Sequence, residues 1–373
     1  MQKKEKAIIS VLLSIMLMMT MMVTGCGSSQ TAGDKEPAKE PEKIKVAFVY
    51  VNSAGDGGWS EAHDQGRKFL EKEIPNIETT FVESVPESAD AETVLTDLAL
   101  KGNKIIFATS FGYMDHVIKV AQKFPDVIFL HCAGFQTAPN VGTYFGRIYQ
   151  SRYLSGLAAG KQTQTNTIGY VAAFPIPEVV RGINAFTLGA QAANPNIKVK
   201  VVWTNTWYNP ATEKEAAKDL LEAGADVIAM HQNTPAPMQA AEERGKFAVS
   251  YNTDMRSYAP KAVLTGPTWN WGPYYVKTVK AVLDKRWRPD QYWGPMSDKI
   301  IDIAPYGPMV REDTKKLIAK KKEEIVKGEW DVFTGPIKDQ QGNVKIPAGQ
   351  RMSDKDLLDS DWFVQGIDGT IPK

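Results

Sequence analysis

Cysteine and histidine are scarce in this chain: its 373 residues include two cysteines and four histidines. His63, His116, His131 and His231 lie far apart without metal-ligand spacing, and the motifs HExxH and CxxC are absent. We therefore expect no metal site. The internal cysteine, Cys132, ends the apolar run VIFLHC, which is typical of a small buried side chain.

The motifs of several enzyme classes are also missing. The chain has no GxxxxGK[ST] phosphate loop and no GxSxG nucleophile elbow, and the glycines of GDGG (55–58) lack the spacing of a dinucleotide-binding fingerprint. Asp56 and Glu61 could be paired as an acid and a base, but no nucleophile accompanies them. The sequence predicts a protein that is not an enzyme and has no cofactor.

Neither sign of charge is in excess, with 44 Lys and Arg against 43 Asp and Glu. This balance gives no indication of a nucleic-acid partner. The lysine-rich segment 315–322 has acidic residues close by and no interleaved aromatics, which indicates a solvated helix face.

The first 26 residues have the pattern of a secretory leader. A basic start, MQKKEK, precedes an apolar run and the sequence VTGC, which ends at Cys26. The cysteine after TG resembles the lipobox of bacterial lipoproteins, in which the thiol is lipidated; an ordinary signal peptide cleaved nearby is the alternative. The polar segment 26–43 is typical of a flexible tether. A lipidated Cys26 would leave Cys132 without a disulfide partner.

From Ile44 onward, short apolar runs alternate with amphipathic segments. The runs IKVAFVYV, KIIFATS and VIFLHCAG are separated by helical patterns, and the pattern restarts with TIGYVAAF, KVKVVWTNT and ADVIAMHQN. Continuous apolar strands between helices indicate parallel sheets that are covered on both faces. The sequence therefore predicts an α/β fold of two doubly wound, Rossmann-like lobes.

Sheets of this kind bind ligands beyond the carboxyl ends of their strands. The loops at those ends are rich in aromatic, amide and hydroxyl side chains, which suit a planar, uncharged ligand with polar edges. The expected ligand-binding residues, all drawn from these loops, are Asp56, Gly58, Trp59, Phe111, Tyr113, Phe174, Trp207, Asn233, Asn252 and Asp254.

Several phrases resemble one family in their order and spacing: KVAFVYVNSAGDGGWSEAHDQG, SRYLSGLAAG, ANPNIKVKVVWTNTWYNPATEKEAAKDLLEAGADVI, YNTDM and FTGPIKDQQG. From about Lys45 to Gly366 the chain resembles the basic membrane protein family, lipoprotein substrate-binding components of ABC importers related to purine nucleoside receptors. The resemblance implies the type I periplasmic-binding fold, in which two lobes joined by three hinge crossings close on a ligand. It also implies an ABC permease as partner and a lipid-anchored, extracytoplasmic location; we expect a monomer.

The family places one aromatic after the first, Asp-containing loop and another after the strand VKVVWTNT. These positions correspond here to Trp59 and Trp207, with Trp203 and Tyr208 as alternatives for the second. By this resemblance the two rings would hold a purine base between the lobes.

The chain departs from the nucleoside-binding members at two positions. Those members carry an Asp and a Lys, as ribose ligands, where this chain has Asn252 and Trp269. We therefore expect a free purine base, with adenine favoured over guanine; a nucleoside is the alternative.

Other function classes stay open at this stage: an enzyme acting on nucleosides, a receptor that feeds a signalling partner, and an adhesive lipoprotein. Chain crossings are expected near Arg147, Thr265 and Arg288. The expected parts are a signal peptide (1–25), a tether (26–43), lobe one (44–146 with about 268–287), lobe two (147–265 with about 288–310) and a C-terminal helix and hairpin extension (311–373).

Overall fold

The computed structural model describes residues 43–373. The expected signal peptide, the lipidation site Cys26 and the tether up to residue 42 lie outside the described residues. Among the described helices, none has both the length and the apolar character needed to cross a bilayer.

Six parallel strands form the first sheet, in the order β11-β5-β4-β3-β1-β2. Its four inner strands are buried along almost their whole length because helices cover both of their faces. The strands are β1 (Ile44–Val49), β2 (Ile77–Val82), β3 (Ile105–Ala108), β4 (Ile128–Cys132), β5 (Val141–Gly146) and β11 (Gln291–Gly294).

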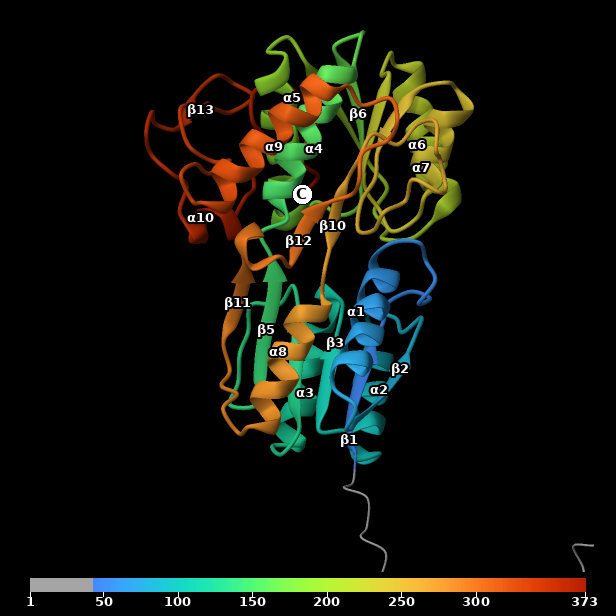
Figure 1. The fold of residues 1–373 in the computed structure, drawn as a ribbon, viewed down its shortest axis with the longest axis vertical. Helices are drawn as coiled ribbons and strands as arrows, with labels where there is room; N and C mark the ends of the chain where they lie inside the picture. The colour runs from blue at the N-terminus through green and yellow to red at the C-terminus, as the bar shows by residue number, and fades with distance from the viewer. Residues whose placement is uncertain (1–42) are drawn as a thin grey trace, which may run out of the picture. The chain divides into compact units, whose positions relative to one another are not determined.

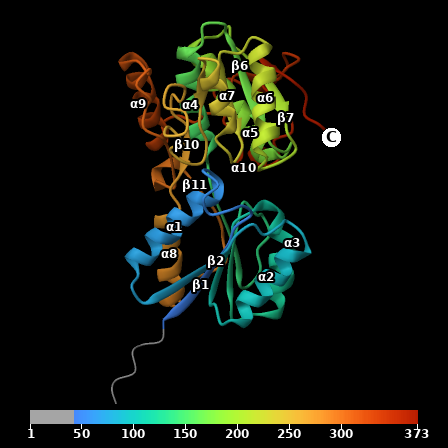
Figure 2. The same ribbon diagram turned by 90° about the vertical axis from the view of Figure 1, so that its right-hand side faces the viewer.

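Four helices cover this sheet, two on each face (Figure 2). One face carries α1 (Trp59–Glu73) and α8 (Gly272–Leu283), and the other carries α2 (Ala89–Leu100) and α3 (Met114–Lys123). We call this sheet and these helices the first lobe.

The second sheet has five parallel strands in the order β15-β7-β6-β8-β9. Helices flank it on both sides (Figure 1), and together they form the second lobe. Its strands are β6 (Thr167–Ala172), β7 (Lys198–Trp203), β8 (Val227–His231), β9 (Phe247–Val249) and β15 (Ile367–Asp368). Its helices are α4 (Tyr149–Gln162), α5 (Pro177–Ala193), α6 (Pro210–Glu222) and α7 (Ala236–Glu243).

Helices α4 and α5 pack with their backbones unusually close. A Cβ added at Gly156 would lie 2.1 Å from the Phe186 carbonyl oxygen, and one at Gly189 would lie 2.0 Å from the Tyr153 carbonyl oxygen. Because backbone atoms cannot move aside as a flexible side chain can, only glycine fits at these two positions.

The chain passes between the lobes after β5, around β10 (Pro267–Trp269) and after β11. Strand β10 pairs with β12 (Ile301–Ile303) in a two-stranded antiparallel sheet. The last crossing differs from the one expected near Arg288, because β11 pairs with β5 and therefore belongs to the first lobe. This strand covers what would otherwise be an open edge of the first sheet.

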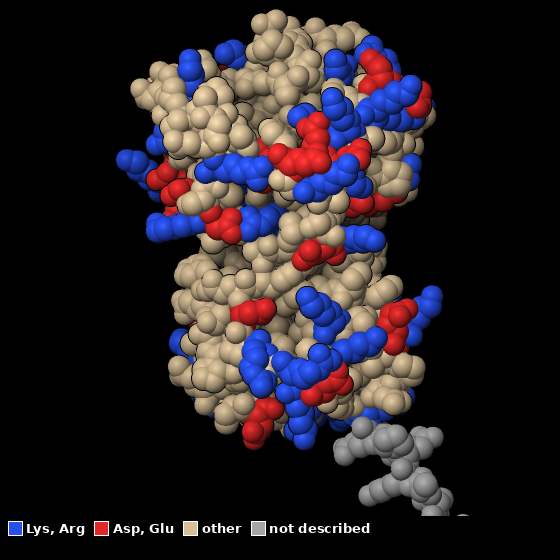
Figure 3. Space-filling model, turned by 60° about the vertical axis from the view of Figure 1, so that its left-hand side comes forward, with Lys and Arg blue, Asp and Glu red and all other residues tan. Residues whose placement is uncertain are grey.

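Residues 311–373, which the sequence predicts as a C-terminal extension, are instead part of the second lobe. Helix α9 (Glu312–Val326) packs along α4, and β13 (Ile337–Lys338) forms the expected hairpin with β14 (Val344–Ile346). After the short helix α10 (Asp354–Leu358), β15 adds a strand beside β7. Charges of both signs are interspersed over the face shown in Figure 3, and Lys315, Lys321 and Lys322 of α9 all pair with acids.

Candidate functional site

A pocket lies where the carboxyl ends of strands from both sheets face each other; its empty volume, counted together with the open solvent at its mouth, is about 380 Å³. Of the residues expected from the sequence, Trp59, Phe111, Trp207 and Asn233 line it. The first lobe contributes Val51, Trp59, Ser110, Phe111 and Ala133, and the second contributes Glu178, Trp207, His231, Asn233 and Tyr251.

Trp59 is the first residue of α1, and the glycine loop before it is folded around Asp56. The Asp56 carboxylate accepts the backbone N–H groups of Gly58 (2.8 Å), Ser60 (3.0 Å) and Glu61 (3.1 Å). Burial raises the pKa of Asp56, and these three donors oppose that rise. Asp56 therefore caps the helix that carries Trp59 and does not line the pocket.

The Trp59 ring is fixed by its own contacts. Its indole Nε1 donates to the Thr109 carbonyl oxygen at 2.6 Å. Trp269 and Trp271 meet it nearly at right angles, with centroids 5.6 and 5.8 Å away, and His63 does so at 4.6 Å. Because its one polar atom is already used, Trp59 can offer a ligand only its apolar ring.

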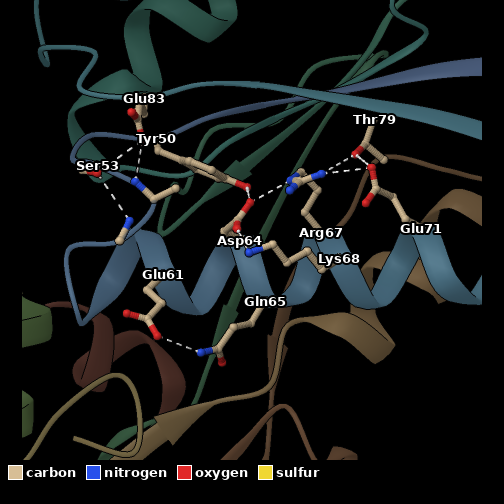
Figure 4. Close-up of polar contacts among 12 residues, drawn as sticks. Tyr50, Ser53, Glu61, Asp64, Gln65, Arg67, Lys68, Glu71, Thr79 and Glu83 are labelled. Atoms are coloured by element: carbon tan, nitrogen blue, oxygen red, sulfur yellow. Dashed lines mark hydrogen bonds and ion pairs between the residues drawn. The ribbon is translucent and has the colours of Figure 1, made fainter.

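Helix α1 is further held by a polar network on the side that faces the sheet (Figure 4). Asp64 accepts from the Tyr50 hydroxyl and from Arg67 Nε, at 3.4 and 2.7 Å. Arg67 also bonds to Glu71 and Thr79, which ties the helix to β2. The position of Trp59 at the start of this helix therefore rests on a rigid scaffold.

Trp207 lies in the loop between β7 and α6. Its carbonyl accepts the backbone N–H of Asn233 at 3.0 Å, and Phe174 packs against its ring with centroids 4.9 Å apart. Trp203, one of the alternatives, donates its indole N–H to the Thr370 carbonyl, away from the pocket. Tyr208 is exposed. Of the three aromatics at this loop, Trp207 is the one that lines the pocket.

The two lobes touch beside the pocket. The Thr253 hydroxyl donates to the Gly57 carbonyl at 2.7 Å. A Cβ at Gly58 would lie 2.6 Å from the Asn233 carbonyl oxygen, so the second lobe leaves room there only for glycine. Gly58 thus allows close contact between the two lobes.

Asn252 and Trp269, the two positions at which we expect a difference from the nucleoside-binding members, are hydrogen-bonded to each other. Trp269 Nε1 donates to Asn252 Oδ1 at 3.0 Å, and both side chains are buried. Asn252 has φ of 74°, a left-handed conformation that Asn tolerates better than most residues. Its amide nitrogen reaches Asn233 Oδ1 at 3.2 Å, so Asn252 lies behind the pocket lining.

Two further expected residues lie away from the pocket. Tyr113 is fully buried in the first lobe, where its hydroxyl donates to the Val85 carbonyl. Asp254 points to the surface and forms an ion pair with Arg256 at 2.7 Å. Both follow the strand-end pattern in sequence, but their side chains turn toward the core and toward solvent respectively.

A polar cluster that the sequence did not predict lies on the second-lobe side of the pocket. Glu178 Oε1 lies 3.3 Å from His231 Nε2, and Arg152 stacks on the Tyr251 ring, with its guanidinium carbon 3.5 Å from the centroid. Arg152 Nη1 donates to the Met230 carbonyl at 2.7 Å, but its Nε and Nη2 have no partner in the described chain. Burial lowers the pKa of His231 to about 4, so the imidazole is neutral at pH 7.

Comparisons with known proteins match this architecture. Residues 43–332 match the Bmp family model, described as ABC transporter substrate-binding protein PnrA-like. A purine-binding protein of Brucella abortus is 44% identical over 337 residues, covering 90% of this chain and 96% of that protein. A Haloferax volcanii protein that carries the name of an ABC transporter glucose-binding protein is 39% identical over 354 residues, covering 93% and 88%.

Solved structures share the fold at lower identity. An ABC transporter solute-binding protein from Aeropyrum pernix aligns with a TM-score of 0.67 and 18% identity, covering 85% of this chain and 98% of that one. This likeness confirms the α/β architecture of parallel sheets.

Proposed function

The chain belongs to the Bmp family of PnrA-like ABC transporter substrate-binding proteins, and we propose that its ligand is a free purine base, with adenine favoured. The family consists of substrate-binding proteins, so the chain is not an enzyme. Proteins of this class act outside the cytoplasm and present a small molecule to a membrane permease.

One observation carries the proposal: two tryptophans from opposite lobes, Trp59 and Trp207, line a single small pocket. Stacking of a base on an aromatic ring is worth about 1–3 kcal/mol per base in nucleic-acid sites, and every base has a face that can stack. The purine-binding relative from Brucella abortus supports the same ligand class.

The bond between Trp269 and Asn252 supports a base over a nucleoside. Their side chains satisfy each other and are buried, so neither offers a free group to ribose hydroxyls. Ribose hydroxyls placed against this satisfied pair would lose their water without gaining a partner there, which disfavours a ligand that carries them.

Mass spectrometry of small molecules released from the denatured protein tests the ligand class first. Calorimetric titration of ligand-free protein with adenine, guanine, adenosine and glucose then tests which of these ligands the protein prefers. We expect adenine to bind most tightly. Because one relative carries a glucose-binding name, glucose is the critical comparison: binding of glucose without binding of any purine would overturn the proposal.

We also propose that Cys26 is the lipid-attachment site and that the protein acts as an anchored monomer. Membrane fractionation of the natural chain and of a Cys26→Ser variant tests this. Equal membrane association of both proteins would contradict the lipid anchor.

A further inference from the structure

Glu178 is the only carboxylate among the residues that line the pocket in the described part of the chain. It is the second residue of α5, which begins at Pro177 after β6, and its side chain is 15% exposed. Acids are common in the first turn of a helix because the dipole favours them there. That preference explains the residue type, but it does not explain a carboxylate that faces an apolar, aromatic pocket.

The carboxylate has few partners of its own. His231 Nε2 is its one close contact, and within residues 43–373 no other hydrogen bond to it is formed. Asp56, on the opposite side of the pocket, accepts three backbone N–H groups. A nearly buried carboxylate needs more donors than one imidazole supplies.

Its charge is nevertheless maintained. Burial pushes the pKa of Glu178 upward, but the His231 bond and the nearby charges of Arg181 and Arg152 outweigh it and leave that pKa below its usual value. Arg181 and Arg152 bond to the backbone carbonyls of Leu357 and Met230 and form no ion pair in the described chain. Glu178 therefore faces the pocket as an anion that can only accept hydrogen bonds.

Several other polar atoms of the lining are already engaged, although the Tyr251 hydroxyl and His231 Nδ1 have no partner in the described chain. The Ser110 hydroxyl donates to Glu87, Trp59 Nε1 donates to Thr109, and Asn233 Oδ1 accepts from Asn252. The strongest acceptor still open to a ligand is the Glu178 carboxylate.

We propose that Glu178 accepts an N–H of the exocyclic amino group of the bound base, and that the pocket thereby selects aminopurines over purines that lack this group. The inference rests on the proposed function, since it assigns the edge of a base whose faces meet Trp59 and Trp207. The neutral His231 holds the carboxylate from the other side by donating its Nε2–H.

Two matched ligand pairs test the proposal, because each differs by one amino group: adenine against unsubstituted purine, and guanine against hypoxanthine. Hydrogen bonds to charged groups contribute enough that we expect loss of the amino group to weaken binding by about 10-fold to 100-fold in the parent protein. Calorimetric titration gives each affinity. Equal affinity within either pair would overturn the proposal.

Glu178→Gln keeps the side-chain shape and the contact with His231, but it removes the charge and presents an amide donor. In this variant we expect the preference for the amino group to fall below about threefold in both pairs, with binding of unsubstituted purine nearly unchanged. Glu222→Gln, on the exposed face of the same lobe, is the matched control and keeps the parent preference.

Failure of the two proposals can be told apart. If the parent protein binds none of the four bases, the proposed function itself is wrong. If the parent binds them and Glu178→Gln keeps the full preference for the amino group, the purine site stands and the role of Glu178 is wrong. Thermal melting of both variants confirms that each is folded.

Discussion

The two sides of the pocket are built differently. On the first-lobe side, Trp59 and Asp56 make their polar contacts within the lobe, so this side presents a fixed apolar surface. On the second-lobe side, buried polar atoms of Arg152, His231 and Tyr251 lack partners in the described chain. Unpaired buried polar groups cost stability, so their presence beside a pocket indicates a place that a ligand or water completes.

This difference separates two tasks. The rigid side suits stacking, which tolerates any flat ring, and the polar side suits selection among rings by their edges. Variants on the two sides should therefore change different quantities: total affinity on the first side, and preference among ligands on the second.

The largest effect is expected at Trp59. Trp59→Ala removes the ring face and should weaken binding of every purine by about 10-fold to 100-fold, while Trp59→Phe should lose much less. Calorimetric titration with adenine and guanine measures both variants. If the ratio of the two affinities changed without a general loss of affinity, the first-lobe side would determine the preference among ligands. That result would contradict the division of roles between the two sides.

A smaller effect concerns the second lobe and pH. Glu213 is fully buried, and burial raises its pKa to about 7, against the hydrogen bonds from Thr234 and Asn209. The folded state then holds a proton that the unfolded state releases above about pH 4.5, so stability falls as pH rises through 7. Between pH 6 and pH 8 we expect this group to reduce the free energy of unfolding by about 1 kcal/mol.

Urea unfolding at the two pH values measures this change. Because His231 and Asp56 also titrate with shifted pKa values, the informative quantity is the difference between the parent and Glu213→Gln. The variant should lose less stability than the parent on going from pH 6 to pH 8. An equal loss of stability in both proteins would contradict the claim that the raised pKa of Glu213 causes this pH dependence.

The smallest effect is expected at Asp254. Its ion pair with Arg256 lies on the surface, outside the pocket, and exposed pairs are worth at most about 1 kcal/mol. Asp254→Asn should leave the affinity for adenine within about twofold of the parent, since it removes no pocket contact. A tenfold loss in the same titration would place Asp254 in the site after all.

The sequence predicted much of the fold because long apolar runs, such as β1, identify buried parallel strands without further context. It could not place β11 or β15, since four residues carrying Tyr and Trp and a strand of two residues have no periodicity to detect. These strands belong to their sheets only through pairing with β5 and β7.

The candidate site was predictable to a similar extent. The strand-end rule found Trp59 and Trp207, because it depends only on where a strand ends. It also selected Tyr113 and Asp254, since spacing does not reveal which way a side chain turns. Glu178 was not predicted because an acid in the first turn of a helix is ordinary. Its place in the pocket becomes evident only from its contact with His231, which is distant in sequence.

The account rests most directly on a purine base bound against Trp59. Titration of ligand-free protein with adenine, run in parallel on the parent and on Trp59→Ala, tests it in one experiment. We expect the parent to bind adenine at one site per chain and the variant to bind about 10-fold to 100-fold more weakly with its fold unchanged. Equal affinity in the two proteins, or no binding of adenine to the parent, would contradict it.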